Sequence, residues 1–404
     1  CYGMRQFLVL SLVLATSLIA EDWPQFLGPR RDGSYQGKAL PAWPAEGPKK
    51  IWDMKIGSGF AGPAVADGRL FLFHRTAGHE VLECANATTG KTIWKYQTTA
   101  DYVDDFGFDD GPRAVPTISA GRVYTLGANG LIKCNDATTG KVLWKVDVRK
   151  QFEAGKGFFG LACSPLVSGR NVLINIGGRS AGIIALDTQS GKIRWKATEG
   201  KSSYASPILT KINDQLHAIF FTREGIVSAE PSSGKVNFSH NWRPAMNASV
   251  NACTPVAVGN LIFVSTSYGK GAIVLAVDGK KLETLWSGDD SLSCHYSSVV
   301  HHDGYLYGFH GRQERGCDLR CVELKTGKVK WSFPGLRAGS VTLAGKELLV
   351  LTERGELVRG PASPNAFRPT ARVQLMGATV RAYPALANGK LYVRNGGELI
   401  CVNL

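Results

Sequence analysis

Short apolar runs alternate with glycine-bearing turns along most of the chain. In one stretch, four runs follow one another over residues 62–65, 69–73, 81–85 and 91–96, with turns at Asp67-Gly68 and Thr89-Gly90. β-Branched and aromatic residues are frequent in these runs, and none has the spacing of an amphipathic helix. The pattern predicts four short β-strands in this unit.

The same unit recurs, and a short signature marks each copy. Threonine or serine is followed by Gly-Lys and, three residues later, by an aromatic residue. Successive aromatic positions are 50, 51, 43, 48 and 45 residues apart, a period typical of propeller blades. The marked aromatic residues are Trp94, Trp144, Trp195, Phe238, Trp286 (in a looser copy with Gly279-Lys280) and Trp331.

The repeats predict an all-β fold, an eight-bladed β-propeller. A single four-stranded sheet cannot bury both faces, so the blades must pack on their neighbours around a ring. The last unit lacks an outer strand, and the segment 50–56, which contains Trp52, has the missing pattern. We therefore expect this N-terminal strand to close the last blade. The innermost strands are expected to begin near Pro63, Pro116, Pro165, Pro207, Pro255, Val299, Ser340 and Pro384.

The signature residues have a structural interpretation. Glycine supplies the positive φ of a tight hairpin turn, and the tryptophan packs between blades while its indole N–H reaches a backbone carbonyl. A polar acceptor eight residues before the aromatic residue is expected to fix the turn. These acceptors are Asn86, Asp136, Asp187, Glu230, Asp278 and Glu323.

The first residues predict export. Met4-Arg5 is a short basic start, residues 7–19 are apolar, and small residues follow. This is typical of a signal peptide, and the apolar run is too short to span a bilayer comfortably. We expect a signal peptide over 4–20, a single propeller domain over 21–404, no transmembrane segment, and a periplasmic or extracellular location.

Charge narrows the classes of partner. The 404 residues include 47 Lys and Arg against 33 Asp and Glu, a net charge of +14. Such a surface attracts anions, but no run of five Lys or Arg residues occurs, so no nucleic-acid partner is expected. An envelope protein or an anionic glycan is the expected partner.

The blade signature, as in Ala185-Leu186-Asp187 to Trp195, resembles the tryptophan-docking motif of pyrroloquinoline quinone (PQQ) repeat proteins. That superfamily includes quinoprotein alcohol dehydrogenases and the outer-membrane assembly lipoprotein BamB. The leader at 23–33 and the segment 111–116 are similar to exported PQQ-like propeller proteins of planctomycete-type bacteria. The resemblance implies the propeller fold and leaves the activity open, because the same blades serve enzymes and scaffolds.

Several features of the enzymes are missing. The sequence has no adjacent cysteine pair, no Cys-x-x-Cys-His haem motif, and no match to the calcium carboxylate or the catalytic aspartate. No catalytic residue is therefore assigned. We expect a noncatalytic scaffold that binds a protein, an anionic glycan or a small ligand at one channel mouth, or a BamB-like envelope module. The alternative is a PQQ-dependent oxidoreductase acting on a sugar or an alcohol, with PQQ and calcium as cofactors.

Cysteines, histidines and glycine strings carry no chemistry in this interpretation. Six cysteines occupy small-residue positions of buried strands, and pairing among Cys294, Cys317 and Cys321 stays open. Four histidines (His295, His301, His302 and His310) fall in one blade without zinc-type spacing, so no metal site is expected. The Gly-x-Gly-x-x-Gly strings at 57–62 and 155–160 lead into strands and are predicted to be turns.

One set of positions predicts a binding site. Three residues before each strand proline, side chains should ring one mouth of the channel. The eight positions are Phe60, Arg113, Ala162, Tyr204, Ala252, Tyr296, Arg337 and Arg381. Arg113, Arg337 and Arg381 would form an anion-binding funnel, with Tyr204, Tyr296, Asn251 and His295 as further ligand contacts. In the alternative interpretation, the arginines pair with carboxylates or with loop carbonyls.

The connection 101–110 is unusual because it contains five aspartates and three aromatic residues. Oxygen-rich loops can bind calcium. The simpler expectation is that this acidic loop folds over the funnel and pairs with Arg113.

Overall fold

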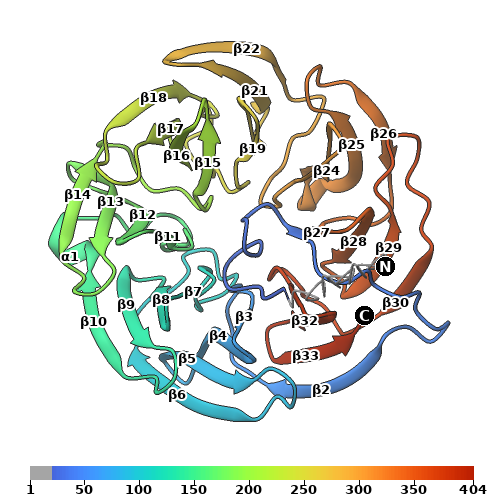
Figure 1. The fold of residues 1–404 in the computed structure, drawn as a ribbon, viewed down its shortest axis with the longest axis horizontal. Helices are drawn as coiled ribbons and strands as arrows, with labels where there is room; N and C mark the ends of the chain where they lie inside the picture. Colours follow the sequence, from blue (N-terminus) through green and yellow to red (C-terminus); the bar gives the residue numbers. More distant parts are fainter. Residues whose placement is uncertain (1–20) are drawn as a thin grey trace, which may run out of the picture.

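The computed structural model describes residues 21–404, and these residues form eight sheets around a central axis (Figure 1). The strands of each sheet pair antiparallel, except that β1 pairs parallel with β27. The predicted eight-bladed propeller is confirmed. Seven sheets have four strands, and the seventh blade gains a fifth strand, β1. The predicted signal peptide lies outside the described residues. Among residues 21–404, no helix is long and apolar enough to cross a membrane.

Within each blade the chain runs from the axis to the rim. Blades 1 to 4 consist of β3 (Ala64–Ala66), β4 (Arg69–Thr76), β5 (His79–Asn86), β6 (Thr92–Thr99); β7 (Thr117–Ser119), β8 (Arg122–Leu126), β9 (Leu131–Asp136), β10 (Val142–Asp147); β11 (Leu166–Ser168), β12 (Asn171–Gly178), β13 (Ala181–Asp187), β14 (Ile193–Ala197); and β15 (Ile208–Ile212), β16 (Gln215–Phe221), β17 (Gly225–Ala229), β18 (Val236–Asn241).

Blades 5 to 8 follow the same order. They consist of β19 (Val256–Val258), β20 (Leu261–Thr266), β21 (Gly271–Asp278), β22 (Lys281–Gly288); β23 (Val300–His302), β24 (Tyr305–Arg312), β25 (Gly316–Glu323), β26 (Val329–Phe333); β27 (Gly339–Ala344), β28 (Glu347–Thr352), β29 (Glu356–Pro361), β30 (Ala371–Gln374) with β1 (Ser34–Tyr35); and β31 (Ala385–Ala387), β32 (Lys390–Arg394), β33 (Glu398–Asn403) with β2 (Lys49–Lys55).

The ring closes through the N-terminal strand, as the sequence predicts. Strand β2 pairs antiparallel with β33, and Trp52 lies opposite Cys401. The inner strands also begin within one residue of the predicted positions. Because the first strand completes the last blade, blade 8 has four strands and the two ends of the chain are held in one sheet.

Five of the eight interfaces between neighbouring blades contain an indole packed on a glycine. Gly90 has a φ of +70°, and a Cβ there would lie 2.7 Å from the ring of Trp52. The Trp52 indole N–H donates to the Ala87 carbonyl at 3.1 Å. The same pair of contacts joins Trp94 to Gly140 and Ala137, Trp144 to Gly191 and Thr188, Trp195 to Gly234 and Pro231, and Trp286 to Gly327 and Leu324.

Four cysteines occupy one repeat position in the sheets. Cys84, Cys134, Cys321 and Cys401 each lie opposite an outer-strand tryptophan, next to an irregularity in the strand pairing. The eight cysteines at positions 84 to 401 are buried free thiols, so the pairing of Cys294 or Cys317 that the sequence left open is not formed.

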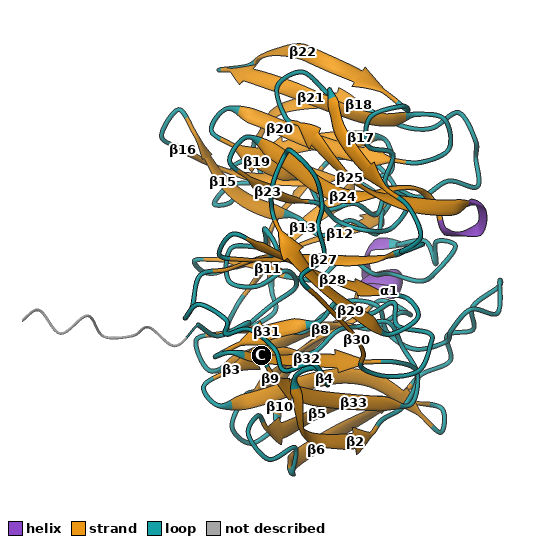
Figure 2. Cartoon of the chain, turned by 90° about the vertical axis from the view of Figure 1, so that its right-hand side faces the viewer, coloured by secondary structure: helices purple, strands orange, loops and turns teal. Residues whose placement is uncertain are grey.

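The connections divide between the two faces of the disc. Helix α1 (Val148–Phe152) and the short η1 turn (Gln313–Arg315) lie on one side in Figure 2. The turns from the first to the second strand of each blade, and from the third to the fourth, lie on the opposite side.

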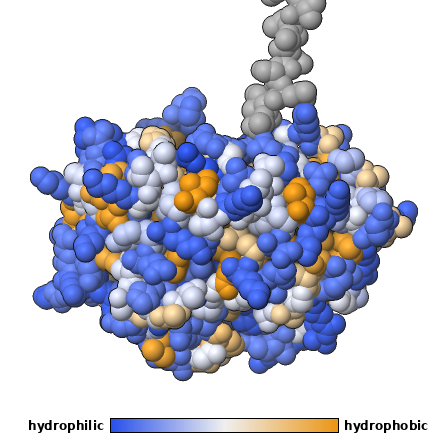
Figure 3. All heavy atoms as spheres, turned by 90° about the horizontal axis from the view of Figure 1, so that it is seen from below, coloured by the Kyte–Doolittle hydropathy of each residue, from blue (hydrophilic) through white to orange (hydrophobic). Residues whose placement is uncertain are grey.

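The rim seen in Figure 3 is mainly hydrophilic, with hydrophobic residues in small separate groups.

We predict that Trp52→Ala lowers the free energy of unfolding by about 3–5 kcal/mol, because it removes a buried indole at the ring closure. Ile51→Ala on the same strand, whose side chain is exposed, should change it by less than about 0.5 kcal/mol. Urea unfolding followed by fluorescence measures both. Equal effects of the two substitutions would mean that the closure strand contributes little.

Candidate functional site

An aromatic chamber of about 370 Å³ lies at one mouth of the propeller. It is built from the connections that precede the inner strands and from loops between the second and third strands. Six phenylalanines and four tyrosines line it. The lining is Phe26, Phe60, Phe106, Phe108, Arg113, Phe158, Phe159, Ala162, Tyr204, Ala248, Val250, Ala252, Tyr268, His295, Tyr296, Arg312, Gln313, Glu314, Arg381 and Tyr383.

The structure brings five of the seven predicted ligand contacts together in this chamber: Arg113, Arg381, Tyr204, Tyr296 and His295. The other two lie elsewhere. Arg337 is exposed and lines a neighbouring groove. Asn251 is buried, and its side-chain amide donates to the Thr222 carbonyl at 2.8 Å. Asn251 therefore has a structural contact in place of a position on the chamber wall.

Arg113 is held by the acidic loop, as the sequence predicts. Its Nη2 lies 2.9 Å from Asp104 Oδ2, and both side chains are largely buried. The same nitrogen also donates to the Asp109 carbonyl at 3.0 Å. The guanidinium faces the Phe60 ring at 5.5 Å and the Phe159 ring at 5.8 Å. Arg113 thus presents a charge-compensated planar surface to the chamber.

The aspartates of the 101–110 loop organise the loop itself. Asp104 accepts from the backbone N–H groups of Phe106 and Asp109, at 3.0 and 3.1 Å. Asp109 accepts from those of Gly59 and Gly111, at 3.0 and 2.6 Å. The other three aspartates have the partners Asn129 (Asp101), Lys156 (Asp105) and the Asp104 amide (Asp110). The carboxylates thereby fix the loop that carries Phe106 and Phe108.

Arg381 is compensated in a similar way across the chamber. Its Nε lies 2.7 Å from Glu353 Oε1, and the Tyr296 hydroxyl donates to the same oxygen. The guanidinium lies 5.5 Å from the Phe108 ring centre. Burial raises the pKa of Tyr296, and the neighbouring Glu353 charge acts in the same direction, so the phenol stays protonated and donates.

His295 sits in a neutral network. Its Nε2 lies 2.8 Å from the Tyr268 hydroxyl, and its Nδ1 contacts Gln313 Oε1. Burial lowers the pKa of His295, so the ring is uncharged near neutral pH. Nearby, Arg312 Nη2 pairs with Glu314 Oε1 at 3.2 Å. Arg113 and Arg381 therefore each pair with a carboxylate, as the alternative interpretation of the sequence describes. Arg312, which that interpretation did not include, is paired as well.

Sequence reasoning placed Phe60 at the mouth but missed the other five phenylalanines of the chamber lining. Phe106 packs on Phe159 at 5.1 Å, and Phe159 packs on Tyr204 at 5.7 Å. Phe106 and Phe108 remain 53% and 52% exposed. A signal existed, since the connections 100–116 and 148–165 are long and each carries closely spaced phenylalanines. The two Gly-x-Gly-x-x-Gly segments, 57–62 and 155–160, form loops and turns, as predicted.

The floor of the chamber comes from the N-terminal leader, which runs into the middle of the ring in Figure 1. Phe26 packs edge-on against Tyr383 at 5.0 Å. Arg31, on the same segment, is 2% exposed and donates to the Ser164 and Pro207 carbonyls at 3.2 and 3.0 Å. It also contacts the Pro165 carbonyl and, at 3.2 Å, Thr117 Oγ1. Burial lowers the pKa of Arg31 to about 10, so it remains charged.

Metal-binding side chains do not converge in the described part of the chain. Among residues 21–404, no group of three or more His, Cys, Asp or Glu side chains is placed to hold a metal ion. In the acidic loop, the carboxylate oxygens that calcium would use already accept backbone N–H groups and face Arg113 and Lys156.

The family model described as outer membrane protein assembly factor BamB matches residues 42–130 and 78–333. Together these spans cover residues 42–333 of the 404. The chain belongs to this BamB-like family of PQQ-repeat propellers. No curated protein sequence matches it.

Solved structures with the same fold include a BamB and two dehydrogenases. BamB from Moraxella catarrhalis is 15% identical, with a TM-score of 0.65, over 88% of this chain and 97% of that one. Quinohemoprotein alcohol dehydrogenase from Comamonas testosteroni is 15% identical, with a TM-score of 0.67, over 94% and 80%. A europium-containing methanol dehydrogenase is 12% identical, with a TM-score of 0.53, over 95% and 98%. At these identities the likeness shows the fold alone.

We predict that Arg31→Ala lowers the free energy of unfolding by about 2–4 kcal/mol, because buried carbonyls lose a charged donor. Arg30→Ala is the matched control, since Arg30 is a partly exposed neighbour paired with Glu21 at 2.8 Å, and should cost less than about 1 kcal/mol. Chemical unfolding compares them. An Arg31→Ala protein as stable as the Arg30→Ala protein would show that the hydrogen bonds of Arg31 inside the channel do not stabilise the fold.

Proposed function

We propose that this propeller is a noncatalytic scaffold of the cell envelope that holds an aromatic segment of a partner protein in the chamber. The observation that carries the proposal is the exposure of Phe106 and Phe108 above a cavity whose guanidinium charges are all compensated. Large exposed apolar side chains beside a concave apolar site are typical of interaction surfaces.

The chamber has the composition of a binding hot spot. Aromatic residues and arginine are enriched among the side chains that dominate interface energies, and such groups cluster in concave desolvated pockets. A volume of about 370 Å³ is near the lower end of the range for ligand sites, about 300–1,000 Å³. A single aromatic side chain or a pair of apolar side chains therefore suits it better than a large cofactor.

The rim of the chamber is organised before any partner arrives. The loop aspartates fix Phe106 and Phe108 through backbone hydrogen bonds, and the Tyr204 hydroxyl accepts from the N–H groups of Phe158 and Phe159 at 2.8 and 3.0 Å. Preorganised contacts lose less conformational entropy on binding. This supports recognition by a formed surface.

An envelope location completes the proposal. The matched family is described as an outer membrane protein assembly factor, and residues 4–19 have a basic start followed by an apolar run. Both support export to the periplasm or the cell exterior, where a protein partner would be another envelope component.

The chamber residues do not fit PQQ, the cofactor that the enzyme relatives imply. PQQ is a planar tricarboxylate, so a site for it needs uncompensated cations and oxygen ligands for a metal ion. Here the three arginines are each paired, and no set of metal-binding side chains converges among residues 21–404. We therefore derive no reaction step through a quinone.

We predict that Phe106→Ser with Phe108→Ser weakens binding of the partner by at least about 30-fold, because it removes two aromatic contacts. The partner is first captured by a photoreactive phenylalanine analogue at position 108 in the full chain within its native host. Leu143, an exposed leucine on β10, is the control position for cross-linking. Leu143→Ser with Leu285→Ser, two exposed leucines, is the control for the binding measurement. Capture at 143 as efficient as at 108, or unchanged affinity in the Phe106→Ser, Phe108→Ser protein, would reject the chamber as the docking site.

The oxidoreductase alternative has its own test. We expect that the full chain mixed with PQQ and calcium retains no stoichiometric quinone after gel filtration and gives no dye-linked oxidation of alcohols or sugars. The physical reason is the compensated charge of the chamber. A stoichiometric quinone spectrum accompanied by turnover would establish an enzyme and reject the scaffold proposal.

A further inference from the structure

A second cavity lies on the face opposite the chamber, in a groove of about 970 Å³ between blades 3 and 4. It is lined by three turns of blades 3 and 4, which join β11 to β12, β15 to β16 and β17 to β18. The turn between β21 and β22 in blade 5 adds Lys280. Inner strands run away from the chamber, so these turns belong to the far end of the disc. The groove is therefore separate from the aromatic chamber.

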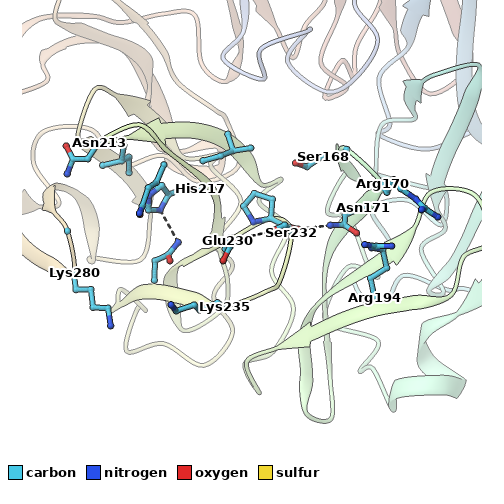
Figure 4. Close-up of a pocket in the computed structure, with 17 residues that line it drawn as sticks. Ser168, Arg170, Asn171, Arg194, Asn213, His217, Glu230, Ser232, Lys235 and Lys280 are labelled. Atoms are coloured by element: carbon cyan, nitrogen blue, oxygen red, sulfur yellow. Dashed lines mark hydrogen bonds between the residues drawn. The ribbon is translucent and has the colours of Figure 1, made fainter.

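Basic side chains stand on both banks of the groove, as Figure 4 shows. Arg170 and Arg194 lie on one side, and Lys235 and Lys280 on the other. Arg170 and Arg194 share one carboxylate, Asp187, at 3.0 and 3.4 Å. Among the side chains that line the groove, Arg170, Arg194, Lys235 and Lys280 are cationic and Glu230 is the one carboxylate, so positive charge is in excess there. The arginines of the chamber, in contrast, have one carboxylate each.

Neutral hydrogen-bonding groups cover the space between the banks. Asn213, Gln215 and Asn237 contribute amides, and Asn171 forms part of the wall with its amide donating to the Pro231 carbonyl at 2.8 Å. The Asn171 side-chain oxygen is buried and accepts no hydrogen bond within residues 21–404. His217 lies deeper, bonded to Ser228 at 2.7 Å. Burial lowers the pKa of His217, so it adds a neutral ring.

We propose that this groove binds an acidic oligosaccharide, one whose sugar rings carry carboxylate or sulfate groups. Cations on the two banks match anionic substituents on alternate sides of a chain, and the amides match sugar hydroxyls. Leu216 is 43% exposed at the groove, and it offers an apolar contact to the C–H face of a ring.

Other polyanions fit this groove less well. The lining contains no phenylalanine, tyrosine or tryptophan, whereas single-stranded nucleic acids are held by bases stacked on aromatic rings. Surface binding to a membrane uses a protruding apolar face, and this site is concave. The inference does not depend on the protein-binding role of the chamber on the other face.

The repeat provides a matched control for the test. Lys235 follows the glycine of the blade 4 signature, and Lys91 and Lys141 hold the same position in blades 1 and 2, away from the groove. All three are exposed. Lys235→Gln with Lys280→Gln and Lys91→Gln with Lys141→Gln therefore make the same change in net charge at exposed turns.

The probe is a fluorescently labelled oligogalacturonide, a chain of sugar rings that each carry a carboxylate, titrated with the full chain. We expect Lys235→Gln with Lys280→Gln to weaken binding by at least about tenfold, and the control pair by less than about twofold. Gln215→Ala, which changes no charge, should weaken it by about threefold. Phe106→Ser with Phe108→Ser should leave it unchanged, so the groove and the chamber are tested separately.

Three results would overturn the inference. The first is no binding by the unmodified chain. The second is an equal loss in the groove and control pairs, which would indicate attraction to net charge alone. The third is groove-dependent binding of single-stranded DNA or of vesicles with anionic phospholipid in place of the oligogalacturonide. Thermal unfolding monitored by circular dichroism confirms that every variant is folded.

Discussion

The contact between an indole and the glycine of the next blade is the constraint on which this structure depends. One glycine satisfies two requirements, because its turn needs a positive φ and its surface must leave room for the ring of the preceding blade. A side chain at Gly90 would meet the Trp52 ring at 2.7 Å, and the same holds at Gly140 for Trp94. Each contact fixes the angle between two blades, and the one made by Trp52 closes the circle.

The site follows from this ring. Equivalent positions before each inner strand converge on one mouth, so Arg113, Tyr204, Tyr296 and Arg381 meet although they are far apart in the sequence. The leader then enters the channel, where Arg31 bonds the inner carbonyls and Phe26 forms the chamber floor. A closed floor turns an open channel into a cavity that a side chain can fill.

The repeat made the fold predictable, including the role of Trp52, because spacing between glycine and tryptophan is a local property. Of the eight mouth positions that it placed by register, seven line the chamber, and Arg337 lies outside it. The pairing of Arg113 with the acidic loop was predicted. The carboxylate that pairs with Arg381 was not, because Glu353 reaches it from a loop of the preceding blade. Phe26 and Phe106 lie outside the repeated pattern, and the far groove is assembled from turns of three blades, which no single repeat reveals.

The two faces differ in how their cations are balanced, and this difference separates the two binding roles. Chamber guanidiniums are each matched by a carboxylate, so apolar contact dominates there. The most direct measurement is the affinity of the captured partner segment for the full chain between 50 and 500 mM salt. We expect the affinity to change by less than about threefold, since compensated and partly buried charges are little affected by screening. A loss of about a hundredfold or more over this range would show instead that unpaired charge governs binding at the chamber.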